Sequence, residues 1–590
     1  MCGIVGGVGN IDFRSYLING LKSLDYRGYD SAGLAYVQEG EIHLFKTVGR
    51  VEKLDEITPK FTGASAAIAH TRWATHGVPS DVNAHPQFSM RQNIFLVHNG
   101  VIENFKTLKN RLQVKGYVFA SETDTEVIAD LLEDFYLSTN DPLIAIRKTI
   151  ATLEGSFACA ILIKDHDELY YMKRSSPILI GVGEGANYLA SDAVPMVRYT
   201  SKFVDVDDDD YGYMTPDEYH LYKDGKEVEP HFVERKVEEC NFDLCGYPHF
   251  MLKETEEAPS VIRRIIDNYY DEDHFTFDPK MIQALKKSDD IVFLACGTSH
   301  YASLLGVDYM HYLGKRSESY IASEWAYYPN VTAKNPVYIL LSQSGETADL
   351  IACQKYLNEN GLTNIALTNT RGSTIDRKAS YSLLIFAGLE VAVAATKSYD
   401  AQVTILALLT AALDGTTNAV RHVQDLIAAI EDVISRREEI HAIAKKIYRA
   451  RDAFFVGRGY DNEAALECAL KLKEIAYVHA EAYAGGELKH GPIALIEKET
   501  PVIGLISDPI SALALRNNLE ELKSRGATII IVATKALKTA GDDFVINDVK
   551  PYLGAIGKVV FGQYLAYYVA LEKGLPIDKP RNLAKSVTVQ

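Results

Sequence analysis

Cys2 is the residue in this chain whose position most directly suggests chemistry. If Met1 is removed, the Cys2 thiol lies beside its own free α-amine. An α-amine titrates near a pH of about 8, so it can accept the thiol proton at neutral pH and leave a nucleophilic thiolate. Gly3, which follows, is small enough for removal of Met1 and for close approach of a substrate. Taken alone, this feature fits an incidental cysteine equally well.

A second candidate site lies at residues 340–347, where an apolar strand pattern runs into small polar residues and then a helical pattern. The residues of this turn are Ser342, Gln343, Ser344, Gly345, Glu346 and Thr347. Backbone N–H groups at such a turn, together with the helix N-terminus, can bind phosphate without net positive charge. The same string also fits a simple capped helix start. The earlier turn at 296–299 offers hydroxyl groups, including that of Ser299, to a sugar.

The chain after residue 285 contains a weak internal repeat. Residues 290–297 match 452–459 in type, and 336–342 match 501–507. Alternating strand and helix patterns follow each match, so we expect two tandem α/β domains with parallel sheets. The second copy has Asp508 and Pro509 where the first has Gln343 and Ser344. Because a carboxylate repels phosphate and proline lacks a backbone donor, we predict that only the first copy binds phosphate.

Length and composition limit the classes of protein that this chain can belong to. Its 590 residues exceed one domain of ~150 residues, and about half of them are apolar. Asp and Glu number 79 against 61 Lys and Arg, a formal charge of −18. This balance argues against a nucleic-acid partner and against an anionic membrane surface. With no apolar run of roughly 18 residues, we expect a soluble, cytoplasmic protein.

Cysteine and histidine spacing argues against a metal or disulfide framework. None of the 7 cysteines forms a CxxC pair. His70, His76, His85 and His98 lack the compact spacing of a ligand set. We therefore expect no metal and no cofactor.

The first 240 residues predict a strand-rich α+β domain with packed sheets. Apolar runs at 3–8, 66–69, 93–97 and 156–163 read as strands, and helical patterns lie around 15–24 and 124–137. The glycines at 181–185 indicate a hairpin turn rather than a nucleotide loop, because no helix pattern follows them. We interpret the acidic run 205–210 as a solvated loop, and residues 246–259 as a connector leading into helix.

Five stretches, taken together, resemble the glutamine amidotransferases with an N-terminal nucleophile. They are residues 2–6, 27–31, 70–77, 97–100 and 121–126, and the resemblance covers roughly 2–235. It implies an N-terminal-nucleophile glutaminase fold in αββα layers. The glutaminase reaction yields glutamate and ammonia.

The resemblance also implies a role for each matching residue. The Cys2 thiolate would attack the side-chain amide of glutamine. The Asn99 side chain and the Gly100 backbone N–H would hold the oxyanion, and one such donor is worth about 10²–10³ in rate. Arg72 would bind the α-carboxylate, and Asp124 would face the α-ammonium. The other pocket residues that the family implies are Trp73, Thr75 and His76.

Residues 469–474, 486–492 and the tail 580–589 resemble the tandem sugar isomerase (SIS) domains of the glucosamine-6-phosphate synthase family. With the amidotransferase half, the resemblance spans essentially the full chain. It implies that the chain converts D-fructose 6-phosphate and L-glutamine to D-glucosamine 6-phosphate and L-glutamate. That reaction is the first step of hexosamine and UDP-N-acetylglucosamine synthesis.

In this family, His490 would help to open the sugar ring, Lys585 would form a Schiff base with the open-chain ketone, and Glu474 would move a proton between C1 and C2. Lys471 lies three residues before Glu474, on the same helix face. A surface ion pair is the alternative for these two residues. The sugar-phosphate contacts that the family implies are Ser299, Ser342, Gln343, Ser344, Thr347, Val393 and Ala584.

Two departures from the family pattern leave the identity of the sugar substrate undecided. Ala395 stands where the family often has Ser, and Ala326 where we expect a basic residue. An amidotransferase acting on another ketose phosphate, or on a fructosamine phosphate, is therefore the first alternative. A non-enzymatic phosphosugar-sensing regulator is the second, although no basic DNA-binding helix is visible and the catalytic residues would then be idle.

We predict an amidotransferase domain over 2–220, a linker over 221–283, SIS domains over 284–423 and 450–580, and a catalytic tail over 581–590. The family is dimeric, with a catalytic histidine that crosses between subunits, so we expect a homodimer. The family also passes ammonia through an internal channel gated by a tryptophan, which we place at Trp73.

Overall fold

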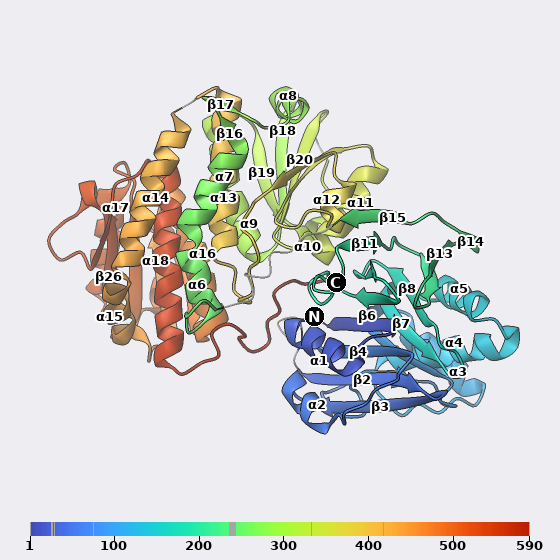
Figure 1. Cartoon of the computed structure of the whole chain (residues 1–590). Helices are drawn as coiled ribbons and strands as arrows, with labels where there is room; N and C mark the ends of the chain where they lie inside the picture. Colours follow the sequence, from blue (N-terminus) through green and yellow to red (C-terminus); the bar gives the residue numbers. More distant parts are fainter. Residues whose placement is uncertain are drawn as a thin grey trace. The chain divides into compact units, whose positions relative to one another are not determined.

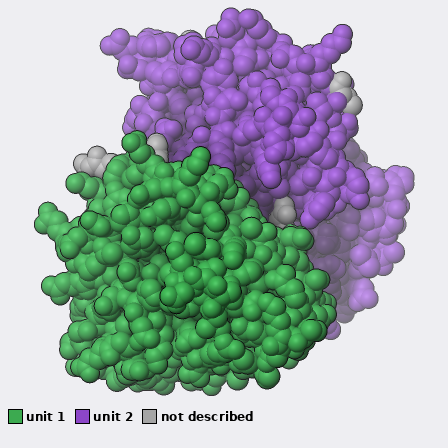
Figure 2. Space-filling model, turned by 90° about the vertical axis from the view of Figure 1, so that its right-hand side faces the viewer, with its two compact units in different colours: residues 1–239, 586–590 green, residues 240–585 purple. Residues whose placement is uncertain are grey.

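The structure is a computed structural model, and it describes residues 2–24, 28, 30–74, 76–234, 244–331, 333–416 and 418–588 (Figure 1). The chain divides into two compact units, which Figure 2 colours separately. Unit 1 comprises residues 1–239 with 586–590, and unit 2 comprises residues 240–585.

Unit 1 is built on two antiparallel sheets. The first has eight strands in the order β15 (His231–Glu234), β11 (Lys202–Asp205), β9 (Leu179–Val182), β10 (Ala186–Ala190), β1 (Gly3–Gly9), β4 (Ala66–Arg72), β2 (Ser31–Gln38) and β3 (Glu41–Val48). The second has seven, in the order β14 (Lys226–Glu227), β13 (Tyr219–Lys223), β12 (Tyr211–Met214), β8 (Leu169–Arg174), β7 (Gly155–Ile163), β6 (Ile94–Ile102) and β5 (Gln87–Phe88).

Alternating side chains along the strands place this sheet pair inside four layers. On β4, Ile68 joins a core shared with Val97 and Ala160 of the second sheet. Ala67 and Ala69 point the other way, into a core with helices α1 (Phe13–Leu24) and α2 (Val51–Ile57). Helices α3 (Phe105–Val114), α4 (Asp124–Thr139) and α5 (Pro142–Thr152) cover the outer face of the second sheet. The predicted αββα order is thereby confirmed.

Several local predictions for this unit are also confirmed. Three of the four predicted strands fall within β1, β4 and β7, the fourth begins one residue before β6, and the two predicted helices are α1 and α4. The glycines at 181–185 join β9 to β10 in an antiparallel hairpin. Thr123 starts α4 by accepting a hydrogen bond from the Glu126 backbone N–H at 3.2 Å.

The acidic run at 205–210 was predicted as a solvated loop, and its two ends contradict this. Asp205 ends β11, and both Asp205 and Asp210 are buried. Lys223 lies 3.4 Å from the buried Asp210 and offsets its charge, while Lys173 lies 2.7 Å from Asp208, between the two buried ends.

Unit 2 contains two five-stranded parallel sheets with the same strand order. The first runs β19 (Ser317–Ile321), β18 (Asp290–Ala295), β20 (Pro336–Ser342), β21 (Thr363–Thr368) and β22 (Tyr381–Leu384). The second runs β24 (His479–Ala484), β23 (Asp452–Gly457), β25 (Pro501–Ile506), β26 (Thr528–Thr534) and β27 (Phe544–Ile546). The repeat predicted from sequence is therefore a repeat of topology, with parallel sheets as expected.

One continuous apolar core joins the two copies. It includes Phe293 of the first sheet and Phe455 of the second. Figure 1 shows α13 (Lys397–Asp414), α16 (Tyr460–Ala476) and α18 (Pro551–Glu572) between the two sheets. Further helices of unit 2 are α8 (Pro279–Lys287), α9 (Gly297–Tyr312), α10 (Ala322–Trp325), α11 (Ala348–Glu359), α12 (Thr374–Lys378), α14 (Ala419–Ser435), α15 (Arg437–Ile447) and α17 (Ala512–Lys523). Three 3₁₀ turns also lie among the described residues of this unit, η2 (Glu487–His490), η3 (Pro492–Leu495) and η4 (Lys535–Leu537).

The predicted connector at 246–259 is largely helical. Helix α6 (Phe250–Glu256) and helix α7 (Ala258–Tyr269) pack into the core of unit 2, and a short hairpin of β16 (Tyr270–Asp271) and β17 (His274–Phe275) follows. Met251 and Ile262 are fully buried, which explains why these residues fold onto the unit. The domain boundaries themselves stay predictions. Among the described residues, no helix is long and apolar enough to cross a membrane.

Candidate active sites

The register of two neighbouring strands positions Cys2. Gly3 of β1 pairs with Thr71 of β4, so the register places Cys2 opposite Arg72, the last residue of β4, and next to Trp73, which follows it. The Trp73 backbone N–H donates to Cys2 Sγ at 3.2 Å. Burial raises the pKa of the Cys2 thiol, while the Trp73 N–H and the Arg72 guanidinium lower it. Gly3 also has a packing role, because a Cβ there would lie 2.8 Å from Thr71 Oγ1.

A buried histidine orients Asn99. His70 Nε2 lies 3.0 Å from Asn99 Oδ1 and 3.1 Å from the His98 carbonyl oxygen. Both partners are acceptors, so Nε2 carries the hydrogen; burial lowers the pKa of His70 to about 3 and keeps the ring neutral. The amide NH₂ of Asn99 is thereby turned toward Cys2, whose carbonyl oxygen it meets at 3.1 Å.

We did not predict this role for His70. The signal was present, because His70 and Arg72 are two residues apart on β4 and so share one face of the strand.

Gly100 follows Asn99 in β6 and can only be glycine. Its φ is +138°, and a Cβ there would lie 2.1 Å from the Ser156 carbonyl oxygen. The backbone next to Asn99 is therefore fixed in a conformation that other residues rarely adopt.

Arg72, His76 and Asp124 leave polar atoms available near one another. Arg72 Nη2 donates to the His76 and Gly77 carbonyl oxygens, while its Nη1 is buried without a hydrogen-bond partner in the described part of the chain. Asp124 Oδ2 accepts from the Ile102 N–H at 2.9 Å and lies 4.0 Å from His76 Nδ1. A cation and a carboxylate together suit the two charged groups of an α-amino acid. Thr75, also predicted here, lies outside the described residues.

In unit 2, the predicted phosphate loop is the turn from β20 to α11. Ser342 Oγ lies 2.8 Å from Thr347 Oγ1 and accepts the Gly345 N–H at 3.0 Å. The Glu346 N–H donates to Ser344 Oγ at 3.2 Å. Gly345 has a φ of +67°, and a Cβ there would lie 1.9 Å from Ser373 Oγ, so the turn requires glycine.

Sheet topology brings a second turn beside this loop. The chain leaves β18 for β19 on one side and returns to β20 on the other, which makes the β18–β20 edge a topological switch point. Ser299, in the first turn of α9 after β18, therefore lies at the same edge as Ser342. Its Oγ accepts from Gln402 Nε2 at 3.0 Å. Gln343 accepts the Asn369 N–H through its backbone carbonyl at 3.1 Å.

Lys471 is fully buried and pairs with the half-buried Glu474, so the alternative of a surface ion pair is wrong. Lys471 Nζ, fully buried on α16, lies 2.5 Å from Glu474 Oε2 and 3.2 Å from Glu467 Oε1. It also donates to Thr298 Oγ1 of the first copy at 3.0 Å. Burial raises the pKa of Glu467 to about 8 against the pull of Lys471, and the two carboxylates raise the pKa of Lys471 although burial opposes it. Glu467 was not predicted.

The tail residue Lys585 is held by an acidic residue from the middle of the chain. Its Nζ lies 2.5 Å from Glu390 Oε2, and both side chains are almost fully buried. Ala584 precedes it, and Val393 lies in the loop that begins with Glu390. His490 ends η2, is exposed, and makes no hydrogen bond or ion pair with the described residues.

The second copy fills its own anion position with a carboxylate. Asp461 accepts the Ser507 N–H at 2.7 Å and the Ser507 hydroxyl at 2.6 Å, and Lys558 Nζ lies 2.6 Å from it. Asp461 matches Ser299 in the repeat, as Ser507 matches Ser342. This buried group is a stronger obstacle to phosphate than Asp508, which is only half-buried.

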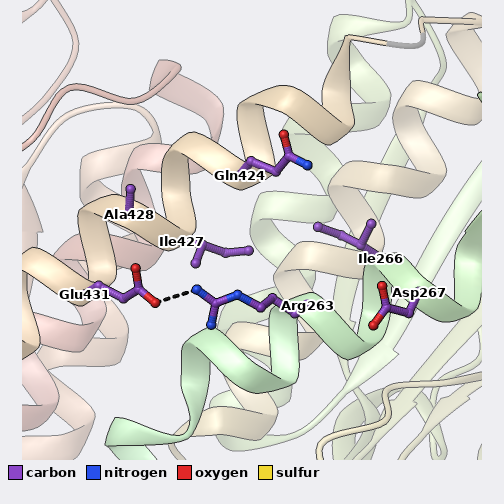
Figure 3. A pocket seen from close by; sticks show the side chains of 7 residues that line it. All are labelled: Arg263, Ile266, Asp267, Gln424, Ile427, Ala428 and Glu431. Carbon is purple, nitrogen blue, oxygen red and sulfur yellow. Dashed lines mark hydrogen bonds and ion pairs between the residues drawn. The ribbon is translucent and has the colours of Figure 1, made fainter.

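A shallow groove between α7 and α14 lies apart from all of these residues (Figure 3). Arg263 of α7 and Glu431 of α14 form an ion pair of 2.5 Å across it. The other lining residues are Ile266, Asp267, Gln424, Ile427 and Ala428. None of the predicted site residues lines this groove.

Family models identify the same division of the chain. A glutamine amidotransferase domain model matches residues 70–196, and the SIS domain model matches 284–412 and 446–573. This chain therefore joins a glutamine amidotransferase domain to two SIS domains.

Curated relatives give the particular family. The glutamine--fructose-6-phosphate aminotransferase [isomerizing] of Bacillus subtilis (strain 168) is 42% identical over 602 residues and 100% of both chains. That of Streptococcus pneumoniae (strain ATCC BAA-255 / R6) is 41% identical over 604 residues, again covering 100% of both. The chain belongs to the isomerising glutamine–fructose-6-phosphate aminotransferase family.

Among solved structures, the C-terminal domain of glucosamine-fructose-6-phosphate aminotransferase from Francisella tularensis aligns with 57% of this chain and 99% of its own. Its TM-score is 0.54 and its sequence identity 28%.

Replacing Asp461 with asparagine tests whether its carboxylate occupies, in the second copy, the position that corresponds to the phosphate loop of the first. The Asp461→Asn variant leaves the Lys558 ammonium buried without a countercharge, so we expect a loss of about 3–5 kcal/mol in the free energy of unfolding. Urea denaturation monitored on unit 2 measures it. The Asp508→Asn change is the control, because Asp508 is only half-buried, and equal midpoints for the two variants would contradict this role of Asp461.

Proposed function

We propose that this chain converts D-fructose 6-phosphate and L-glutamine to D-glucosamine 6-phosphate and L-glutamate. The observation that carries the proposal is the pairing of two sites in one chain. Cys2 lies beside the oriented Asn99 amide in unit 1, and buried Lys471 and Lys585 each face a carboxylate in unit 2. Full-length relatives bear the corresponding name.

In the first half-reaction, the Cys2 thiolate attacks the side-chain amide carbon of glutamine. The Asn99 amide and the Gly100 backbone N–H stabilise the oxyanion, ammonia leaves, and water releases glutamate from the thioester. Arg72 Nη1 binds the α-carboxylate of the substrate, and Asp124 faces its ammonium. Trp73, Thr75 and His76 complete the pocket. The reaction requires removal of Met1, which frees the Cys2 amine as the base.

In the second half-reaction, neutral groups hold the phosphate of the sugar. The binding residues are Ser299, Ser342, Gln343, Ser344, Thr347, Val393 and Ala584. His490 assists ring opening, and the Lys585 amine condenses with the C2 ketone, losing water. Ammonia then replaces lysine at C2, and Glu474 moves a proton from C1 to C2, converting a ketose imine to an aldose amine. Lys471 balances the charge beside Glu474.

His490 gives a reason to propose a homodimer. It is exposed and unpaired among the described residues, as expected if it completes a site on a second subunit. We further propose that the protein works in the cytoplasm without a nucleic-acid partner, and that ammonia passes through an internal channel gated by Trp73.

The test is product analysis with the Met1-processed protein. L-glutamine and fructose 6-phosphate should give glucosamine 6-phosphate and glutamate in equal amounts, quantified by mass spectrometry. Other ketose phosphates and a fructosamine phosphate serve as a panel, because Ala326 and Ala395 depart from the family pattern. Glutamate without amino sugar from fructose 6-phosphate would contradict the acceptor assignment.

The Cys2→Ala variant separates the two half-reactions. It removes the nucleophile, so glutamine hydrolysis should fall to background while ketose-to-aldose isomerisation of fructose 6-phosphate is retained. Glutamate release and aldose formation are measured in parallel. Undiminished glutamate release would refute the role of Cys2.

The Trp73→Ala variant tests ammonia transfer. The contact with Cys2 uses the Trp73 backbone, which the substitution preserves. Glutaminase activity should therefore remain, while glucosamine 6-phosphate per glutamate falls several-fold as ammonia escapes to water. A parallel loss of both products would argue against the gate.

A further inference from the structure

The loop from Glu390 to Thr396 carries two groups of the proposed sugar site, yet contains no helix or strand. Glu390 faces Lys585, and Val393 is a proposed sugar contact. An irregular buried loop needs partners for its backbone N–H groups. Its partners are mainly acidic residues, and they come from distant parts of the chain.

Glu254 of α6 holds the start of this loop. Its Oε1 accepts the Val391 N–H at 2.5 Å and the Ala392 N–H at 3.2 Å. The side chain is buried, and its Oε2 has no hydrogen-bond partner among the described residues. Glu254 therefore bonds to the backbone on the C-terminal side of Glu390.

Asp578 ties the same helix and loop to the C-terminal segment. Its carboxylate accepts the Phe250 and Met251 N–H groups at 2.8 and 2.9 Å, at the start of α6. Its backbone carbonyl accepts the Val393 N–H at 3.0 Å. Helix α6, the loop and the segment that leads to Lys585 thus form one hydrogen-bonded network.

Glu390 completes the network at the reactive lysine. Its Oε1 accepts the Thr396 and Ser398 N–H groups at 2.9 and 3.1 Å. Its Oε2 accepts the Ser398 hydroxyl at 2.7 Å and faces Lys585 Nζ at 2.5 Å. The position of the Lys585 amine therefore depends on the position of the loop that carries Glu390.

We propose that Glu254 is a positioning residue for the sugar reaction, which fixes the Glu390–Thr396 loop and, through Glu390, the Lys585 amine. The inference rests on the proposed Schiff-base role of Lys585. It gives α6, which lies within the predicted linker, a part in the isomerase site. A displacement of about 1 Å at a reacting group can cost about 100-fold in rate, so the loop's anchor matters.

The carboxylate's environment favours this role over simple packing. Burial and the neighbouring Glu390 raise the pKa of Glu254 to about 8, while Lys585 and Lys397 oppose the rise. A buried acid beside another acid costs stability, and its two backbone hydrogen bonds both go to this loop. Holding the loop therefore requires an acceptor oxygen at the distance from the α6 backbone that a Glu side chain provides.

Two conservative variants separate the effect of side-chain length at residue 254 from the effect of its charge. Glu254→Gln keeps the length and an acceptor oxygen, whereas Glu254→Asp keeps the carboxylate but is one methylene shorter. Each variant is incubated with fructose 6-phosphate and sodium borohydride, which reduces the C2 imine to a stable secondary amine. Peptide mass spectrometry then measures the sugar attached to Lys585 over time.

We expect Glu254→Gln to form the adduct within about threefold of the wild-type rate, and Glu254→Asp to be at least about tenfold slower. Fructose 6-phosphate affinity, measured by calorimetry, should change less than the adduct rate, because the proposed phosphate contacts at 342–347 do not lie on this loop, although Val393 does. Glutamine hydrolysis should be unchanged. Glu256→Gln is the matched control, since Glu256 lies on the same helix and pairs instead with Arg437.

The reverse order of the two variants, or equal rates in all proteins, would overturn the positioning role of Glu254. If the wild-type protein itself gives no adduct, the Schiff-base role of Lys585 fails, and this inference fails with it. The two failures are therefore distinguishable.

Discussion

The binding of an anion by an acidic protein is the constraint on which the sugar unit depends. With a formal charge of −18, the chain offers no general attraction to a phosphorylated substrate. Charges farther than a Debye length of about 10 Å are largely screened, so local groups decide. In the proposed function the β20–α11 turn supplies the hydroxyls of Ser342 and Thr347, which lie 2.8 Å apart, and the left-handed φ of Gly345 makes the turn possible. The parallel sheet presents this turn at its switch point.

The second copy applies the same turn chemistry to an internal anion. Ser507 donates its N–H and its hydroxyl to Asp461, much as a phosphate loop donates to a ligand. That copy then contributes different chemistry, because Lys471 on α16 reaches Thr298 of the first copy. In the proposed function, duplication has thus produced one half that binds the sugar phosphate and one half that supplies acid, base and cation to it.

Patterns of residue type predicted much of the fold. The apolar run at the start of β4, which is buried at every residue, and the βα alternation after residue 285 each have a direct physical cause in side-chain burial. The acidic run at 205–210 failed as a prediction because its neutralising lysines come from other strands. The residues of helix α6 were predicted as a connector, because the helix is stabilised by the burial of Met251, whose partners are distant in the sequence.

The site divides in the same way. Motifs indicated Cys2 and Asn99. The spacing of His70 and Arg72 indicated a shared strand face, but the contact of the His70 ring with Asn99 follows only from the placement of β4 beside β6. Glu390 contacts Lys585 across 195 residues of sequence, and Glu254 bonds to the backbone next to Glu390 across 137, separations that no local pattern encodes. The role of Asp461 could have been predicted from the sequence, since the repeat alone aligns it with Ser299.

The central claim is that nitrogen passes from glutamine to the sugar within one protein. The direct measurement supplies glutamine labelled with ¹⁵N at the side-chain amide, together with fructose 6-phosphate and a large excess of unlabelled ammonium. We predict glucosamine 6-phosphate that carries the label almost completely, because the transferred ammonia never mixes with the solution. Amino sugar with the isotopic composition of the surrounding ammonium would contradict the account.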